Sequence, residues 1–265
     1  MSRIYKAFEN KKAFIAFLTA GDPDYETSLK NFRAVLEAGA DLVEVGIPFS
    51  DPIAEGPVIQ EADIRALSSG MTTDKVFELV KELRKDFDTP IVFMTYANPV
   101  YHYGTDKFFE KAAKAGADGI IIPDCPYEER HEFDETAAKY GMDFISMIAP
   151  TSEDRIKMIA AQAKGFIYVV SSLGVTGVRS EIKTDLSTIL SLIKEATDTP
   201  AAIGFGISNP EQAGKMAQYA DGVIVGSAMV KIVAEYGKDA PEKLSEFVKG
   251  IKAAIYIIEK NRKIT

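Results

Sequence analysis

The sequence predicts an α/β protein: a single-domain (β/α)8 TIM barrel, spanning residues 1–265, with a short extra helix at its N-terminus. Three observations favour this fold. Apolar, β-rich segments alternate with amphipathic segments along the whole chain, a short sequence repeat recurs between them, and no shift in composition marks a second domain. A chain of 265 residues also suits one barrel.

Eight short segments account for the strands of the predicted barrel. Each is almost continuously apolar, as expected for parallel strands that are buried on both faces. In chain order they are residues 14–18, 42–45, 91–95, 119–122, 144–148, 166–170, 201–204 and 222–225.

The segments between these strands carry apolar residues at the 3.6-residue period of a helix. The clearest faces are Leu29, Phe32 and Leu36; Val76, Leu79, Val80, Leu83 and Phe87; and, in the last helix, Leu244, Phe247, Val248, Ile251, Ile255 and Ile258. Residues 1–10 are expected to form the extra helix, which covers the bottom of the barrel.

A repeat supports the same alternation. Residues 38–43, AGADLV, recur as AGADGI at 115–120 and more loosely at 220–223. A glycine after a helix permits a left-handed C-cap, and the next strand then begins at once. An open, doubly wound sheet is the alternative, but no Gly-x-Gly-x-x-Gly turn follows the first strand.

The composition is that of a soluble globular protein, with 46% apolar and 26% charged residues. No segment approaches the roughly 20 apolar residues that span a bilayer, and residues 1–12 lack the apolar run of a signal peptide. One cysteine cannot form an internal disulfide, which agrees with a reducing compartment. We therefore expect a cytoplasmic protein without a membrane role.

The net charge is −8 and the isoelectric point is about 5.0. Nucleic-acid binding requires a basic surface, so the charge argues against it. An acidic protein that binds phosphate must do so with local backbone dipoles.

Glu44 is the most informative single residue. It interrupts an apolar strand, where a carboxylate is costly unless it is neutralised or paired. Alternation places Leu42, Glu44 and Gly46 on one face of the strand. If that face lines the barrel mouth, burial raises the pKa of Glu44 toward values useful in acid–base catalysis. A structural Glu paired with an Arg or Lys is the alternative.

Three glycine-rich segments follow the sixth, seventh and eighth strands, at residues 174–177, 204–208 and 226–228. In barrels, the loops after the last two strands and a nearby helix N-terminus commonly bind phosphate. Ser227 could both cap such a helix and donate to the phosphate. Ordinary tight turns are the alternative, but the clustering of three such loops favours a phosphate site.

Other catalytic groups are scarce in this sequence. His102 and His131 are its only histidines, and no pair of residues has metal-ligand spacing, so a zinc-dependent aldolase is not expected. No predicted strand or strand end carries a lysine, which argues against a Schiff-base mechanism. Cys125 and His131 could form a nucleophile pair, but Cys125 is better explained as a small buried residue.

Residues 42–60, LVEVGIPFSDPIAEGPVIQ, closely resemble the signature of the tryptophan synthase α chain family. The segments at 17–23, 94–99, 174–177 and 204–208 resemble other motifs of that family, in the same order and across nearly the whole chain. The resemblance implies a lyase of tryptophan biosynthesis that cleaves indole-3-glycerol phosphate into indole and glyceraldehyde 3-phosphate.

The resemblance also implies roles for individual residues. Glu44 matches the acid–base residue, and Glu55 matches a carboxylate, usually Asp, that stabilises the indole N–H. Thr176 matches a lid residue within 173–182, where Ser172 stands in place of an Arg that some members carry. The apolar wall that surrounds the indole in this family is matched by Phe17, Tyr96, Ile121, Tyr168 and Phe205. Barrel packing explains Ile121 equally well. The phosphate site predicted from the glycine-rich segments comprises Gly177, Gly206, Gly226 and Ser227.

The resemblance further implies an α2β2 tetramer with a β subunit. Pyridoxal phosphate is expected only in that β subunit, with no cofactor or metal in this chain. The matching contact residues are Asp51, Pro52, Asn98, Pro99, Asp124 and Pro126. The alternative is that these prolines only stiffen turns.

Two other functions are open at this stage. One is another barrel enzyme of tryptophan or histidine biosynthesis, which would require a Lys, Cys or Asp at strand ends that are apolar here. The other is a stand-alone lyase, or a subunit kept mainly as an allosteric activator of a β subunit. Intact Glu44 and Glu55 argue against the activator.

Overall fold

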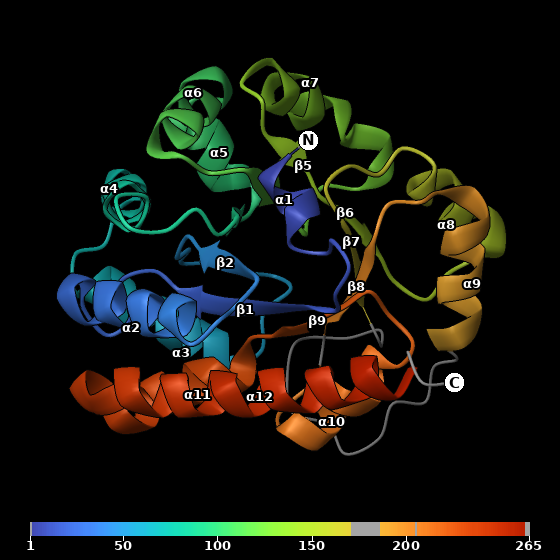
Figure 1. Ribbon diagram of the computed structural model, residues 1–265. Coiled ribbons are helices and arrows are strands. Elements are labelled where there is room, and N and C mark those ends of the chain that lie inside the picture. Colours follow the sequence, from blue (N-terminus) through green and yellow to red (C-terminus); the bar gives the residue numbers. More distant parts are fainter. Residues whose placement is uncertain (1, 171–185, 205, 263–265) are drawn as a thin grey trace.

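The computed structural model describes residues 2–170, 186–204 and 206–262, and its strands form one parallel sheet that is nearly closed into a barrel (Figure 1). The sheet order is β5-β4-β3-β2-β1-β9-β8-β7-β6. The strands are β1 (Ala13–Thr19), β2 (Leu42–Gly46), β3 (Ile91–Met94), β4 (Gly119–Ile121), β5 (Asp143–Phe144), β6 (Ser146–Ile148), β7 (Ile167–Val170), β8 (Ala201–Gly204) and β9 (Gly222–Val225).

The predicted fifth barrel strand is divided into two. We expected one strand over 144–148, but β5 pairs with β4 and β6 pairs with β7, with Ile145 between them. The backbone N–H of Ile145 still donates to Ile120 O at 2.9 Å. Because β5 and β6 are consecutive in the chain, the ring closes through Ile145, and the nine strands correspond to the eight predicted ones.

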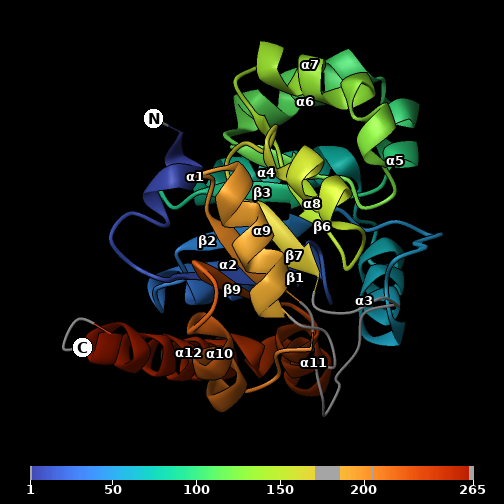
Figure 2. The ribbon, with the colours of Figure 1, turned by 90° about the vertical axis from the view of Figure 1, so that its right-hand side faces the viewer.

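Helices surround this ring, and the last three lie together on one side of it in Figures 1 and 2. The α-helices are α1 (Arg3–Lys6), α2 (Tyr25–Glu37), α3 (Pro57–Ser68), α4 (Thr73–Leu83), α5 (Ala97–Tyr103), α6 (Thr105–Ala115), α7 (His131–Lys139), α8 (Glu153–Ala160), α9 (Leu186–Ala196), α10 (Pro210–Ala217), α11 (Ser227–Tyr236) and α12 (Ala240–Arg262). Two 3-10 turns, η1 (Tyr127–Glu129) and η2 (Gly237–Asp239), complete the connections.

The N-terminal helix is the predicted extra element. Ile4 of α1 is fully buried and belongs to the cluster of apolar side chains inside the barrel. Arg3 forms a salt bridge with Asp118 at 2.8 Å, just before β4. The helix thus closes the end of the barrel where the strands begin.

The repeat marks a structural device that uses its aspartate as well as its glycine. Gly39 and Gly116 have a φ of +100°, the left-handed conformation expected after a helix. The aspartates accept backbone N–H groups from a neighbouring strand: Asp41 from Phe14, Asp118 from Ile91, and Asp221 from Ala201, at 2.8, 2.9 and 3.0 Å. Each aspartate therefore ties the beginnings of two adjacent strands together.

Candidate active site

Glu44 occupies the middle of β2 and points into the barrel, because Leu42, two residues earlier, packs in the interior cluster. Its side chain is 1% exposed, and Oε1 has no hydrogen-bond partner among the described residues. No lysine or arginine of that set pairs with it. Burial, and secondarily the charge of Glu55, raise the pKa of Glu44 to about 8. Within the described part of the chain, the alternative of a paired structural Glu has no support.

Glu55 lies at the end of the loop that joins β2 to α3, and it is 5% exposed. The Tyr96 hydroxyl donates to the Glu55 carboxylate and accepts the backbone N–H of Ala54 at 3.1 Å. The Gln60 side-chain amide donates to the backbone oxygen of Glu55 at 2.7 Å. Tyr96, expected only in the indole wall, therefore also positions the loop and its carboxylate.

Asp63 is a third buried carboxyl group that the sequence reasoning missed. It lies on the buried face of α3, where Ile59, Ala62 and Ala66 also lie, and it is 7% exposed. Burial and the charge of Glu55 raise the pKa of Asp63 to about 8, although its carboxylate accepts the backbone N–H of Phe49. An acidic residue on an apolar helix face was the available signal.

Two aromatic rings lie against inward-facing glycines at the top of the barrel. A Cβ atom on Gly46 would lie 2.8 Å from the Phe17 ring, and one on Gly226 would lie 3.3 Å from it. A Cβ atom on Gly204 would overlap the Tyr168 ring. These glycines therefore provide the space in which the two rings stand.

Tyr168 is buried close to the two candidate catalytic groups. Its pKa is raised well above the ordinary value by burial and by the charges of Glu44 and Glu55. Ile121 is completely buried in the interior cluster beside Tyr168, so its packing role is evident. The predicted wall residue Phe205 lies outside the described residues, as does the predicted lid residue Thr176.

The helix termini near the predicted phosphate site differ in how they are capped. At α10, the Asn209 side chain accepts the backbone N–H of Gln212, and the Gln212 side chain accepts that of Ser208. At α11, Gly226 occupies the N-cap position, and no side chain of the described residues caps the helix. The first N–H groups of α11, from Ser227 onward, are thus better placed to receive an anion.

The other predicted phosphate residues can be placed only in part. Gly206 has a φ of +77°, which a glycine adopts without strain, and it follows β8. Gly177 lies outside the described residues.

The predicted partner contacts lie in the segments that follow β2, β3 and β4, but Asn98 and Pro99 are in the first turn of α5 rather than in a loop. Asp51, Asn98 and Pro126 are exposed, whereas Pro52, Pro99 and Asp124 are half-buried. Asp124 also has an internal role, because its carboxylate accepts the backbone N–H of Ala97 at 2.9 Å.

Two exposed apolar side chains lie in the same segments and were not predicted. Ile53 is 74% exposed in the β2–α3 loop, and Tyr101 is 49% exposed on α5. An exposed large apolar residue among polar loop residues is typical of a contact surface.

Other classes of site find no support in the described residues. No group of three or more His, Cys, Asp or Glu side chains among them could hold a metal ion. None of the helices in the described ranges is long and apolar enough to cross a membrane. Burial raises the pKa of the Cys125 thiol to about 11, so Cys125 is not an activated nucleophile.

Together, the barrel and the buried carboxyl groups at its mouth define a class of protein: a (β/α)8-barrel enzyme equipped for acid–base chemistry. Comparison with known proteins identifies the family. Residues 5–255 match the family model of the tryptophan synthase alpha chain. The alpha chain of Lacticaseibacillus casei is 51% identical over 255 residues, which cover 96% of each chain.

Solved structures agree with this match. The tryptophan synthase subunit alpha from Legionella pneumophila is 37% identical, has a TM-score of 0.88, and is matched over 97% of this chain and 99% of that one. Another solved structure is described as showing the basis of mutual activation in the tryptophan synthase a2b2 complex of Pyrococcus furiosus. Its matching chain is 39% identical to this one, with a TM-score of 0.83, and the match covers 92% of this chain and 98% of that one. The protein belongs to the tryptophan synthase alpha chain family.

Proposed function

We propose that this protein, as one barrel domain in the cytoplasm, catalyses the retro-aldol cleavage of indole-3-glycerol phosphate to indole and glyceraldehyde 3-phosphate through Glu44 and Glu55. The observation that carries this assignment is the buried Glu44, which has a pKa of about 8 and lies near Glu55. At neutral pH, a carboxyl group with that pKa holds a proton and can act as a general acid.

In the first step, Glu44 protonates C3 of the indole ring and becomes a carboxylate. The ring becomes a cationic indolenine, which then accepts the electron pair of the breaking bond between C3 and the glycerol carbon. No lysine or metal is needed as an electron sink in this scheme. Glu44 next removes the proton from the hydroxyl on that carbon as the aldehyde forms, and its starting protonation state is restored.

Glu55 stabilises the positive charge that develops at the indole N–H, as an oriented carboxylate in a buried site can do. Its negative charge also contributes to the raised pKa of Glu44. One anionic group thus keeps the acid protonated before the reaction and stabilises the cation during it. Tyr96 holds Glu55 in place through its hydroxyl group.

The aromatic rings of Phe17 and Tyr168 provide an apolar wall for the indole. The phosphate group binds to backbone N–H groups at the start of α11, at Gly226 and Ser227, with Gly206 nearby. This uses α11 rather than α10, because the Gln212 N–H in the first turn of α10 and the preceding Ser208 N–H already have side-chain acceptors.

The experiment is to incubate the purified protein with indole-3-glycerol phosphate in D2O and to analyse the indole by mass spectrometry and NMR. Protonation at C3 requires that each turnover place one deuterium at that carbon. Release of indole without C3 deuterium in the initial phase would contradict the proposed step, and no release with or without a β subunit would contradict the assignment.

We further propose that the protein assembles with a pyridoxal-phosphate β subunit as an α2β2 tetramer, through the loops that contain Asp51, Pro52, Asn98, Pro99, Asp124 and Pro126. Pyridoxal phosphate belongs to the β subunit, and this chain works without a cofactor of its own. The exposed Ile53 side chain supports this surface, since it lies in the same loop as Glu55. A β subunit that contacts this loop can therefore influence the catalytic carboxylate directly.

A further inference from the structure

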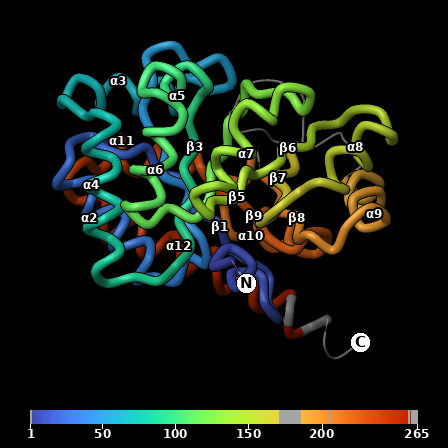
Figure 3. Tube along the Cα trace, turned by 90° about the horizontal axis from the view of Figure 1, so that it is seen from above, coloured from blue at the N-terminus to red at the C-terminus, as the bar shows by residue number. Residues whose placement is uncertain are grey.

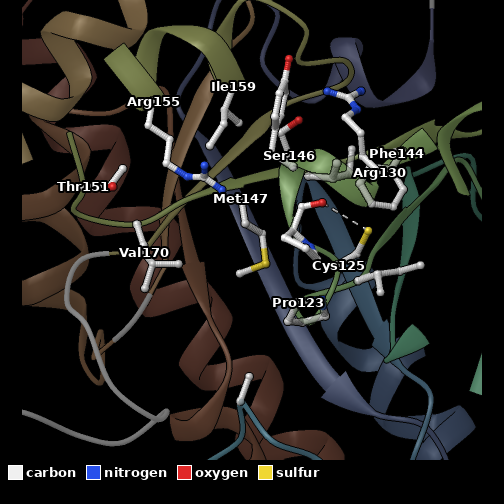
Figure 4. A pocket seen from close by; sticks show the side chains of 16 residues that line it. Pro123, Cys125, Arg130, Phe144, Ser146, Met147, Thr151, Arg155, Ile159 and Val170 are labelled. Atoms are coloured by element: carbon white, nitrogen blue, oxygen red, sulfur yellow. Dashed lines mark hydrogen bonds between the residues drawn. The ribbon is translucent and has the colours of Figure 1, made fainter. Parts of the chain in front are cut away.

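A pocket of about 330 Å³ lies between the segments that follow β4 and β6 (Figure 4). Phe144 and Ile159, from the outer packing layers, line it together with Met147, which packs against the cluster inside the barrel. It coincides with a boundary in the hydrophobic core. Phe144 and α7 belong to one large cluster, whereas Ile148 and α8 belong to a second one. Ser146, a small residue between Phe144 and Ile148, lies at this boundary and lines the pocket.

The packing of the outer helices explains why the space is open. α6 packs against α7, and α8 packs against α9, but α7 and α8 do not form a comparable contact. Figure 3 shows α8 and α9 on one side of the molecule and α4 and α6 on the other. The split of the fifth barrel strand at Ile145 falls at the same place.

The pocket has apolar walls and a positively charged lining. Among the described residues, the charged side chains that line it are Arg130 and Arg155, which stand on opposite sides in Figure 4 with Ser146 and Met147 between them. The Cys125 thiol stays neutral at pH 7, because burial raises its pKa to about 11. The apolar and aromatic walls include Phe144, Met147, Ile159 and Tyr127.

Arg130 carries an unused donor in this pocket. The residue is 8% exposed, and its Nη2 donates to Asp134 at 2.7 Å and to the Gln162 backbone oxygen at 3.4 Å. Its Nη1 is buried without a hydrogen-bond partner among the described residues. A buried donor left unpaired is costly, so an acceptor that reaches Nη1 is favoured.

Arg155 forms an ion pair across the space between two elements that border the pocket. Its guanidinium on α8 donates to both Glu128 carboxylate oxygens in η1, at 2.6 and 3.0 Å. Both side chains are exposed, and exposed ion pairs contribute little to stability, so this pair can open. Glu128 therefore competes with any anion for Arg155.

We propose that this pocket is a second binding site, separate from the active site, for a small aromatic carboxylate. The carboxylate accepts from Arg130 Nη1 and from Arg155, and the ring lies between Phe144, Met147 and Tyr127. The volume suits a ligand of about ten non-hydrogen atoms, at the lower end of small-molecule sites. The lining also includes Ala54, the neighbour of Glu55, so the site adjoins the catalytic loop.

The test uses 4-fluorobenzoate as the probe and fluorine NMR titration of the full chain as the readout. The active site is first saturated with indole-3-propanol phosphate, which lacks the reacting hydroxyl groups. We expect 4-fluorobenzoate to bind with a millimolar dissociation constant. The alcohol 4-fluorobenzyl alcohol lacks the charge, so its binding should be weaker by a factor of about five or more. Failure of the carboxylate to bind at 10 mM, about ten times the expected dissociation constant, would overturn the proposal, as would binding that occurs only when the analogue is absent.

Single substitutions give opposite expected changes. Arg155→Gln should weaken binding of 4-fluorobenzoate about three- to fivefold, and Glu128→Gln should strengthen it by a similar factor, because it releases Arg155. Lys157→Gln is the matched control on the same helix, since Lys157 pairs with Glu195 instead of lining the pocket. Equal affinities in Arg155→Gln, Glu128→Gln and the unsubstituted protein would refute the site. So would an effect of Lys157→Gln as large as that of Arg155→Gln.

Discussion

Replacement of Glu44 by Gln should remove catalysis and, at the same time, stabilise the folded protein above acidic pH. The amide has nearly the same shape as the carboxyl group, but it cannot donate and recover a proton. Indole release should therefore fall about 100-fold or more. Circular dichroism should show an unchanged fold.

The effect on stability follows from the difference in pKa between the folded and unfolded chains. The pKa of Glu44 is about 8 in the folded protein and 4.5 in the unfolded reference. Below pH 4.5, both states hold the proton, and the group has no pH-dependent effect. Between pH 4.5 and 8, the unfolded chain loses its proton while the folded protein retains it, so the free energy of unfolding decreases as the pH rises.

The size of this decrease can be estimated from the same two values. Each pH unit in this range contributes about 1.4 kcal/mol, so the loss between pH 4.5 and 7 is roughly 3 kcal/mol. The glutamine variant lacks this loss. The difference in unfolding free energy between the variant and the unsubstituted protein should therefore grow by roughly 3 kcal/mol in favour of the variant from pH 4.5 to 7.

The assay is urea unfolding of both proteins at several pH values from 4.5 to 9, followed by fluorescence and circular dichroism. The pH dependence of the difference is the informative quantity, because it is independent of how well the amide is accommodated. A difference that stays constant across this range would show that Glu44 does not titrate with a raised pKa. Near-normal turnover in a well-folded Glu44→Gln protein would remove Glu44 from the mechanism.

Three further predictions concern the other residues of the site and its surroundings. Glu55→Asp should retain most of the activity in single-turnover assays, whereas Glu55→Ala should lose about 100-fold, because only a carboxylate can offset the charge at the indole N–H. Equal rates for the Ala variant and the unsubstituted protein would show that Glu55 is only a loop residue. Tyr96→Phe should lower kcat about tenfold with little change in KM, since the substitution removes the hydrogen bonds to Ala54 and Glu55 but keeps the ring. A change confined to KM would assign the hydroxyl group to substrate binding instead. Ile53→Glu should weaken association with a β subunit at least tenfold in sedimentation or calorimetric assays. The lyase activity of the isolated chain should stay the same. An unchanged affinity for the β subunit would show that Ile53 is not part of the interface.

Much of this architecture follows from local sequence patterns. Strands buried on both faces require continuous apolar segments, and helices require a 3.6-residue period, so the eight barrel strands and the clearest helices could be predicted from the sequence. Alternation along β2 placed Glu44 on the same strand face as Leu42, and in the structure Leu42 packs inside the barrel while Glu44 is buried. The resemblance to a known family supplied the chemistry and is confirmed by the comparisons.

Only the tertiary structure shows features that depend on residues distant in the chain. The split at Ile145 arises because β5 pairs with β4 while β6 pairs with β7, and neither partner is encoded in the strand itself. The pKa of Asp63 depends on Glu55 and on burial beneath a loop, and Tyr96 reaches that loop from another element. Arg130 Nη1, which has no partner among the described residues, likewise borders the space between α7 and α8. Backbone preference and hydrophobic periodicity act over a few residues, whereas burial, electrostatic coupling and cavities are set by how segments far apart in the sequence pack together.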